Sequence, residues 1–159
     1  MTDIPSLDRT DFAILRLLQN NARMSNKEVA AHVGLAQSSC HERIRRLSES
    51  GVIRGAHIDI DAKAVGVGLE ALYMIELAKH ERGTVDRFLN AVIDIPEVRS
   101  AFLVSGRYDL VVHVAVRDTE HLKNLALDSF TSDAGVTRIE TSIIFEARGR
   151  HSVPLPEGA

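Results

Sequence analysis

The first third of the chain holds two short segments in which apolar residues recur with helical spacing. The first segment follows Asp8, whose side chain can cap the backbone N–H groups that open a helix. The second opens with Ser-Asn-Lys-Glu at residues 25–28, the pattern of a capping box, and Gly34 can end it in the left-handed conformation. The pattern therefore predicts two short helices, separated by a stop at Asn20-Asn21.

A third helix is predicted within the stretch GLAQSSCHERIRRL, residues 34–47. From Cys40 onward its apolar residues recur at i, i+4 and i+7, which gives one buried face, and Gly51 closes the helix. Residues 52–60 read as a short hairpin. Two helices, a glycine turn, a third helix and a hairpin make the layout of a winged helix-turn-helix, so residues 1–61 are predicted to form a DNA-binding domain.

In a winged helix-turn-helix, the second helix of the pair enters the major groove with its N-terminal residues at the base edges. Short polar residues at the start of the third helix are therefore predicted to contact bases: Gln37, Ser38, Ser39 and His41. The arginines further along are predicted to meet phosphates: Arg43, Arg45 and Arg46. A solvated helix in which Glu42 pairs with Arg45 and Arg46 explains the same charges, but it leaves the preceding helices unexplained.

The second part of the chain alternates between strand and helix patterns. Strands are predicted at residues 69–77, 98–105, 110–116 and 137–145, with one helix at 85–93 capped by Thr84 and another opened by Asp118. The order βαββαβ is that of a ferredoxin-like, or ACT-like, sandwich. The predicted fold class is therefore α+β, with residues 62–159 as a ligand-sensing and oligomerisation domain.

The predicted strands carry apolar residues on both faces. Strand 69–77 has Tyr73 and Ile75 on one face and Leu72 and Met74 on the other. Two helices can cover only one face of a four-stranded antiparallel sheet, so the other face would be an exposed apolar patch in a monomer. The sequence therefore predicts a homodimer that stacks sheet on sheet.

Charge is distributed unevenly along a chain whose formal net charge is −3. Residues 1–55 hold 8 Lys and Arg against 6 Asp and Glu, whereas residues 56–159 hold 11 against 16. A basic first third on an acidic remainder favours a nucleic-acid module joined to a different kind of domain. There is no apolar run that could span a bilayer and no signal-peptide pattern at the N-terminus, so a cytoplasmic protein without a membrane partner is expected.

The sequence contains no constellation typical of catalysis or metal binding. Its seven histidines include no pair at HxxxH spacing, and Cys40 has no partner cysteine. The GxSxG, Walker and GxGxxG motifs are absent. No catalytic residue, metal or cofactor is therefore predicted.

Many of these positions together resemble one protein family. They run from the first cap to the end of the third helix: Asp8, Ile14-Leu15, Leu18-Gln19, Ser25-Asn26, Glu28, Val33-Gly34-Leu35, Cys40, Glu42-Arg43, Arg45-Arg46-Leu47 and Gly51-Val52-Ile53. They resemble the Lrp/AsnC, or feast/famine, family of transcriptional regulators, and the resemblance covers about residues 7–150. It implies a sequence-specific regulator of double-stranded DNA, modulated by an amino-acid effector, that forms dimers and often tetramers of dimers.

The start of the third helix departs from the family. A Ser-Pro pair is common there, and this chain has Ala36-Gln37 instead; Ser39 stands where a second proline is often found. Ser25 and Asn26, at the start of the second helix, complete the set of residues expected at the DNA.

The stretch Ser105-Gly106-Arg107-Tyr108-Asp109 is open to two interpretations. Glycine and aspartate suit an ordinary hairpin turn. The family's Gly-x-Tyr/Phe-Asp motif matches the same stretch, and in the family this loop borders the effector pocket. The resemblance implies that Asp109 accepts an effector ammonium and that backbone N–H groups near Gly106 meet its carboxylate.

The same resemblance supplies the far wall of the pocket, from a neighbouring subunit: Thr141, Ser142 and Ile143. Arg107 departs from the acidic or small residue common in the family, and it either adds affinity for an acidic ligand or points to solvent. A function from another class also fits a sensing domain, namely an amino-acid-sensing regulatory subunit or enzyme with an ACT-like domain and a helical appendage. The capping-box helices and the basic first third favour the regulator.

Overall fold

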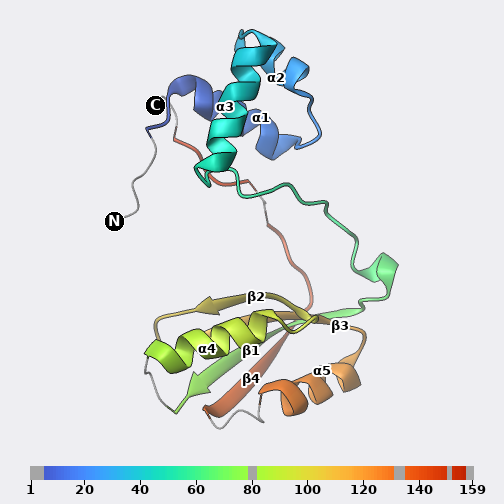
Figure 1. Cartoon of the computed structure of the whole chain (residues 1–159). Helices are drawn as coiled ribbons and strands as arrows, with labels where there is room; N and C mark the ends of the chain where they lie inside the picture. Colours follow the sequence, from blue (N-terminus) through green and yellow to red (C-terminus); the bar gives the residue numbers. More distant parts are fainter. Residues whose placement is uncertain (1–5, 79–81, 131–134, 150–151, 157–159) are drawn as a thin grey trace. The chain divides into compact units, whose positions relative to one another are not determined.

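The computed structural model describes residues 6–78, 82–130, 135–149 and 152–156, and it divides into two compact units (Figure 1). The first unit comprises Met1–Asp59 with Arg148–Ala159, and the second comprises Ile60–Ala147. The sequence assigned everything after residue 61 to the second domain. The structure instead groups the described part of the C-terminal tail with the first unit.

The described part of the first unit is built on α1 (Arg9–Asn20), α2 (Asn26–Val33) and α3 (Gln37–Glu49). The predicted caps of the first two helices are confirmed. Asp8 and Ser25 each close a capping box with the residue three positions on, and Gly34 ends α2 in the left-handed conformation at φ 68°. These caps satisfy backbone groups that a short helix would otherwise leave open, so local sequence alone specifies where both helices begin.

Helix α3 begins at Gln37 without a side-chain cap, because Ala36 has no polar group to offer. Its position depends instead on packing. Cys40 and Leu47 are buried with residues from the other two helices, Ile14, Val29 and Ala30. The third helix is thus held by the core of the unit, as its apolar spacing predicted.

The hairpin predicted after α3 is wrong. Residues 52–62 form no strand, and Lys63–Val65 form one turn of 3₁₀ helix, η1. Val52 and Ile53 pack against the core of the first unit, whereas the later apolar residues remain in solvent, with Ile58 71% and Ile60 54% exposed. A two-stranded hairpin is marginal in water unless it packs on something, and residues 54–61 are all exposed.

The described second unit has the predicted order. Its elements are β1 (Leu69–Leu77), α4 (Arg82–Ile93), β2 (Val98–Leu103), β3 (Leu110–Val116), α5 (Thr119–Leu125), the π turn η2 (Ala126–Phe130) and β4 (Val136–Ile144). The antiparallel sheet has the order β2-β3-β1-β4, which confirms the ferredoxin-like sandwich. The predicted Thr84 cap is wrong, because α4 begins at Arg82 and Thr84 lies within its first turn.

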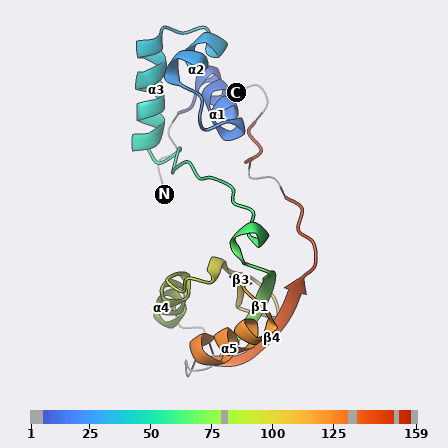
Figure 2. The same ribbon diagram turned by 90° about the vertical axis from the view of Figure 1, so that its right-hand side faces the viewer.

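Helices α4 and α5 lie on the same side of the sheet (Figures 1 and 2). On that side Tyr73 and Ile75 are fully buried. The other side carries Leu72 and Met74 on β1, half-buried, and Phe102 on β2, 52% exposed. Within one chain this second face is only partly covered, as the alternation of apolar residues predicted.

Tyr73 gives the second unit a defined sensitivity to alkali. Its hydroxyl donates to the carbonyl of Leu122, its ring meets Phe130 edge-on with centroids 5.1 Å apart, and burial raises the pKa of Tyr73 to about 12. Because the folded pKa lies above the ordinary value of 10, the stabilisation by the neutral phenol is complete below pH 10 and is lost as pH rises through 12. A pKa difference of about two corresponds to roughly 3 kcal/mol.

Circular dichroism between pH 9 and pH 12.5 should therefore show the parent losing strand signal in this window. Tyr73→Phe should lose less strand signal over the same interval. Its free energy of unfolding should be about 1 kcal/mol lower at the outset, because the hydrogen bond of the hydroxyl is missing. Parallel curves for the two proteins would mean that Tyr73 does not control alkaline unfolding.

Candidate nucleic-acid interface and effector loop

Four residues predicted to contact DNA converge at the N-terminal end of α3. Asn26, Gln37, Ser38 and His41 line a shallow hollow of about 460 Å³. The side-chain amide of Asn26 lies 2.7 Å from Nδ1 of His41, so the first residue of α2 is tied to the second turn of α3. The uncapped N–H groups of α3 open at the same end, where the helix dipole favours an anion. The hollow therefore combines hydrogen-bonding side chains with a positive helix terminus.

Two other residues of the predicted set stand apart from this hollow. Ser39 is exposed on α3 but does not line it. Ser25 is engaged in the α2 capping box, where its Oγ and its backbone N–H both lie 2.7 Å from a carboxylate oxygen of Glu28. Hydrogen bonds from Ser25 hold the pKa of Glu28 below its ordinary value of 4.5. Ser25 thus positions α2 in the structure.

Arg43 turns inward, which the sequence did not predict. Its Nη1 lies 2.7 Å from a carboxylate oxygen of Asp8 and 2.9 Å from one of Asp11, and its side chain is 29% exposed. The backbone N–H of Asp11, and then the Arg43 guanidinium, hold the pKa of Asp8 below its ordinary value of 3.8. Arg43 therefore joins α3 to the cap of α1.

Asp11 is the centre of this network and was missed as a site residue. Its carboxylate is fully buried and accepts from Arg43, from Arg46 at 2.7 Å and from the Asp8 backbone N–H at 3.1 Å. The sequence showed Asp11 only as the second half of a capping box. Its other partners are 32 and 35 residues away in the chain, so no local pattern marks them.

Arg45 lies on the solvent side of α3. It reaches Glu42 at 2.5 Å and Glu49 at 2.9 Å, and its side chain is 53% exposed. The hydrogen bond from Arg45 lowers the pKa of Glu42 from its ordinary value of 4.5. The predicted pair of Glu42 with Arg45 is present, whereas Arg46, 57% exposed, is held by Asp11.

The second candidate site is the loop between β2 and β3. Gly106 adopts φ 131°, a conformation that favours glycine, and Ser105 and Arg107 are exposed. Hydrogen bonds of Asp109 close the loop. Its carbonyl accepts from Val104, its N–H donates to the Ile75 carbonyl, and its carboxylate accepts the Leu77 N–H at 2.8 Å. The turn interpretation of this stretch is therefore correct as far as local structure goes.

Tyr108 connects the loop to β4. Its hydroxyl donates to the Glu140 carboxylate, which lies 3.5 Å from Arg138, and the Arg107 guanidinium lies 5.3 Å from the Tyr108 ring centre. The Tyr108 hydrogen bond lowers the pKa of Glu140 from its ordinary value of 4.5. Glu140 and Arg138 were not in the predicted set.

The predicted far wall occupies the next part of β4. Thr141, Ser142 and Ile143 are exposed and pair with β1 at Tyr73, Leu72 and Ala71. Asp109 meets β1 further along, at Ile75 and Leu77. Within one chain, the loop therefore contacts β4 at Glu140, next to the predicted segment.

Comparisons with known proteins identify the family of both units. Residues 70–153 match the family model described as the Lrp/AsnC ligand binding domain, and residues 7–54 match a winged helix-turn-helix DNA-binding model. The HTH-type transcriptional regulator AldR of Mycolicibacterium smegmatis is 41% identical over 140 residues, which are 88% of this chain and 82% of AldR. The chain belongs to the Lrp/AsnC family. The Bacillus subtilis transcriptional regulator AzlB is 33% identical over 95% of this chain and 97% of its own length.

Solved structures of the Lrp/AsnC fold superpose over most of the chain. The crystal structure of MtbAldR matches with a TM-score of 0.76 and 37% identity, over 93% of this chain and all of that one. The Neisseria meningitidis regulator NMB0573, solved as a complex with L-Met, matches with a TM-score of 0.85 and 28% identity, over 94% and 97% of the two chains. The predicted family and fold are confirmed, and the protein is an effector-modulated DNA-binding transcriptional regulator.

The described residues contain neither a membrane-spanning helix nor a cluster of metal ligands. Their helices are all too short or too polar to cross a membrane. They also bring together no group of three His, Cys, Asp or Glu side chains that could hold a metal ion.

Proposed function

We propose that this regulator reads its operator with the N-terminal end of α3 and binds an amino acid at the loop of residues 105–109. The observation that supports the DNA contact is the hollow in which Asn26, Gln37, Ser38 and His41 converge beside uncapped backbone N–H groups. Amide, hydroxyl and imidazole groups in one place can donate to and accept from base edges in the major groove.

Arg45 and Arg46 supply the affinity for phosphate in this proposal. Both guanidinium groups are more than half exposed, and the exposed pairs of Arg45 with Glu42 and Glu49 are weak enough for a phosphate to replace them. Arg43 is held by both Asp8 and Asp11 and is only 29% exposed, so it acts by positioning α3, whereas Arg46 bonds Asp11 but remains 57% exposed. The proposal thus divides the predicted arginines into two roles.

Ser38→Ala and Arg45→Ala should separate base recognition from phosphate affinity. Ser38→Ala should weaken binding to the protein's own upstream DNA by about 1–3 kcal/mol and leave binding to random DNA and the salt dependence unchanged. Arg45→Ala should weaken binding to both and reduce the salt slope by about one. Fluorescence anisotropy over a salt series measures both quantities. Lys123→Ala, exposed in the second unit, serves as control. Identical behaviour of the two α3 variants would contradict this division of roles.

An amino acid is the class of effector that the loop suits. NMB0573, a family member, was solved with L-Met. Asp109 accepts the Leu77 N–H, and a ligand ammonium would share the same carboxylate. A Cβ atom added at Gly106 would meet no atom within 4 Å. The exposed backbone there therefore leaves space for the ligand carboxylate. Thr141, Ser142 and Ile143 would close the site from a second subunit.

Asp109→Asn should weaken amino-acid binding about ten-fold or more, because a charge-assisted hydrogen bond is worth on the order of 1.5–3 kcal/mol. The asparagine oxygen can still accept the Leu77 N–H, so the loop should keep its shape. The measurement is calorimetric titration with whichever of the amino acids raises the melting temperature in a thermal-shift screen. Equal affinities of parent and variant would leave Asp109 as a turn residue only. Arg107→Gln tests in parallel whether that residue selects an acidic ligand.

The proposed assembly is a homodimer formed through the open face of the sheet, and further association into tetramers of dimers is expected from the family. Leu72, Met74 and Phe102 support it, because they share that face and are incompletely covered. The relatives named above are transcriptional regulators, which favours this function over an amino-acid-sensing enzyme or subunit. A regulator works where the DNA is, so the expected location is the cytoplasm.

A further inference from the structure

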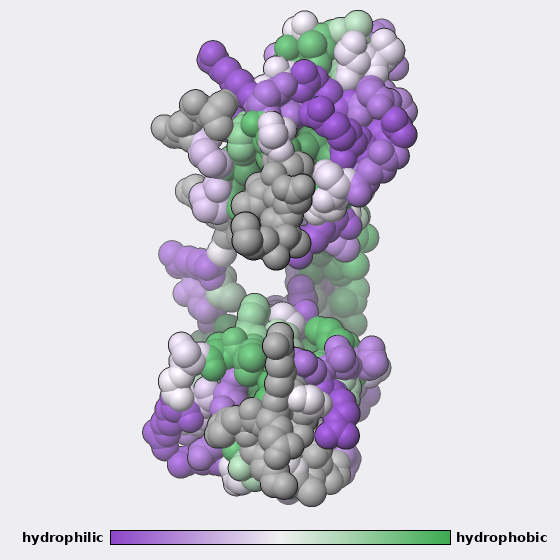
Figure 3. Space-filling model, turned by 60° about the vertical axis from the view of Figure 1, so that its left-hand side comes forward, coloured by the Kyte–Doolittle hydropathy of each residue, from purple (hydrophilic) through white to green (hydrophobic). Residues whose placement is uncertain are grey.

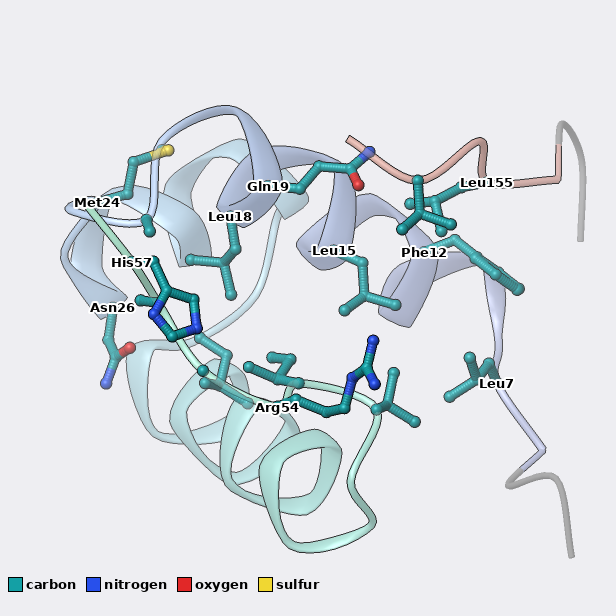
Figure 4. Close-up of a pocket in the computed structure, with 17 residues that line it drawn as sticks. Leu7, Phe12, Leu15, Leu18, Gln19, Met24, Asn26, Arg54, His57 and Leu155 are labelled. Atoms are coloured by element: carbon teal, nitrogen blue, oxygen red, sulfur yellow. The ribbon is translucent and has the colours of Figure 1, made fainter. Parts of the chain in front are cut away.

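An apolar groove of about 920 Å³ runs beside α1 in the first unit. Figure 3 shows one face of this unit, where hydrophobic side chains lie exposed between hydrophilic ones. Phe12, Leu15 and Leu18 of α1 line the groove, and Arg54 and His57 of the linker lie across from them (Figure 4). Ile44 of α3 and the rest of linker residues 52–57 also line it. Leu15, Leu18 and Ile44 pack against the core cluster of the unit but are only partly buried, so the groove gains from being covered.

The C-terminal tail of the chain lies in this groove. Leu155 is half-buried and lies beside Phe12 and Leu15 (Figure 4), and Val153 lines the groove with 64% of its surface exposed. An Arg16 guanidinium nitrogen donates to the Pro156 carbonyl at 2.5 Å. One apolar anchor and one charge-assisted hydrogen bond therefore hold the tail on α1.

The sequence of the tail suits a docked, extended segment. Residues 153–156 read Val-Pro-Leu-Pro, so each apolar residue precedes a proline and is restricted to extended conformations. The two prolines fix their own φ near −65° and have no N–H to satisfy. Little conformational freedom remains to be lost on docking, which favours binding by a small contact area.

The groove is also the place where both connections to the second unit meet the DNA-binding unit. Linker residues 52–57, which lead toward the second unit along the chain, line the groove. Val153 and Leu155 of the tail, which follows the second unit along the chain, line the same groove. The tail follows β4, the strand that carries the proposed effector residues 141–143. Asn26, which contacts His41, lines both this groove and the hollow at the start of α3.

We propose that residues 152–156 are an intramolecular strap: they dock in the α1 groove, restrain the linker and couple the sensing domain to the DNA-binding unit. The docking stands on the contacts of Leu155 and Pro156. The coupling rests on the proposed effector site, because β4 is the element that would transmit ligand binding to the strap.

Leu155→Asp should release the strap, because a carboxylate is poorly solvated against Phe12 and Leu15, and a partly exposed ion pair with the nearby Arg16 would offset little of that cost. In the full chain, the backbone amide of Ile53, which donates to the Leu47 carbonyl, should then exchange with deuterium roughly ten-fold faster, the factor that corresponds to ~1.4 kcal/mol. Gly149→Asp is the matched control, because it adds the same charge at an exposed position where a Cβ meets nothing within 4 Å. Exchange in Leu155→Asp equal to that of the control would overturn the docking.

Mixed oligomers distinguish a strap in its own chain from one donated by a second copy. Leu155→Asp labelled with ¹⁵N is combined with unlabelled parent protein, and exchange of the Ile53 amide is read separately for the two masses. The strap predicts fast exchange in the labelled chain alone. Fast exchange in the unlabelled chain would show docking between copies and overturn the intramolecular assignment.

The coupling is tested by the effect of an amino acid on DNA affinity. The probe is the amino acid that raises the melting temperature of the parent, and the DNA is the upstream fragment that the parent binds. Leu155→Asp should bind this amino acid as the parent does, while the change in DNA affinity that the amino acid causes should fall toward one-fold. An unchanged effect would overturn the coupling. If no amino acid raises the melting temperature, the proposed effector fails, whereas the exchange experiment still decides the docking.

Discussion

Asp11→Ala is expected to lower the free energy of unfolding of the DNA-binding unit by about 3 kcal/mol. Removing one partner of a buried ion pair typically costs 3–5 kcal/mol. The value here should lie at the lower end, because Arg43 and Arg46 are 29% and 57% exposed and water can solvate them after the change. The variant also loses half of the α1 capping box. Both losses weaken the attachment of α3 to α1.

Amide exchange in peptides of α1 and α3 measures this destabilisation, with an expected acceleration of roughly hundred-fold. Tyrosine fluorescence would miss it, because Tyr73 and Tyr108 are the only tyrosines, both lie in the second unit and the chain has no tryptophan. Arg45→Ala is the control, since it removes only exposed ion pairs and should cost less than about 1 kcal/mol. A loss in Asp11→Ala no larger than in this control would show that the buried carboxylate contributes little.

The elements that the sequence predicted correctly are those whose causes are local. Asp8, Ser25 and Gly34 cap backbone groups within a few residues, so their meaning can be read without knowing the fold. The alternation in residues 69–77 and 110–116 likewise places β1 and β3 at their observed bounds, because it records which side chains meet the core. The same kinds of pattern predict the order of the remaining elements, and the family resemblance implies the same fold.

The features that the sequence did not predict depend on partners far away in the chain. Nothing near Asp11 marks it as the acceptor for Arg43 and Arg46. The apolar residues at 52–60 suggested a hairpin, but a strand needs a neighbouring strand, and the structure supplies none there. The tail at 152–156 has too few residues to show any periodicity. Only its contacts with α1 in the folded chain support its proposed role as a strap.

The dimer interface can be tested where it depends on Leu72. This residue lies on the open face of the sheet, opposite His113 on β3 and Ser142 on β4. Leu72→Asp should therefore be tolerated in a single subunit, where the carboxylate has water and two polar neighbours. In a sheet-on-sheet dimer the same carboxylate would be buried beside His113, which is already engaged with Glu70 at 2.6 Å, at a cost of several kcal/mol.

Leu72→Asp is thus expected to weaken dimerisation by at least about a hundred-fold, the factor that corresponds to roughly 3 kcal/mol. Sedimentation velocity over a range of protein concentrations should show a folded monomer for this variant where the parent remains dimeric or larger. Val65→Asp is the control, because Val65 is 64% exposed in η1, outside the sheet, and should leave the assembly unchanged. Circular dichroism must show native strand content in both variants, so that loss of assembly is not confused with unfolding. If Leu72→Asp sediments as the parent does, the open face is not the contact between subunits, and its apolar residues are covered in another way.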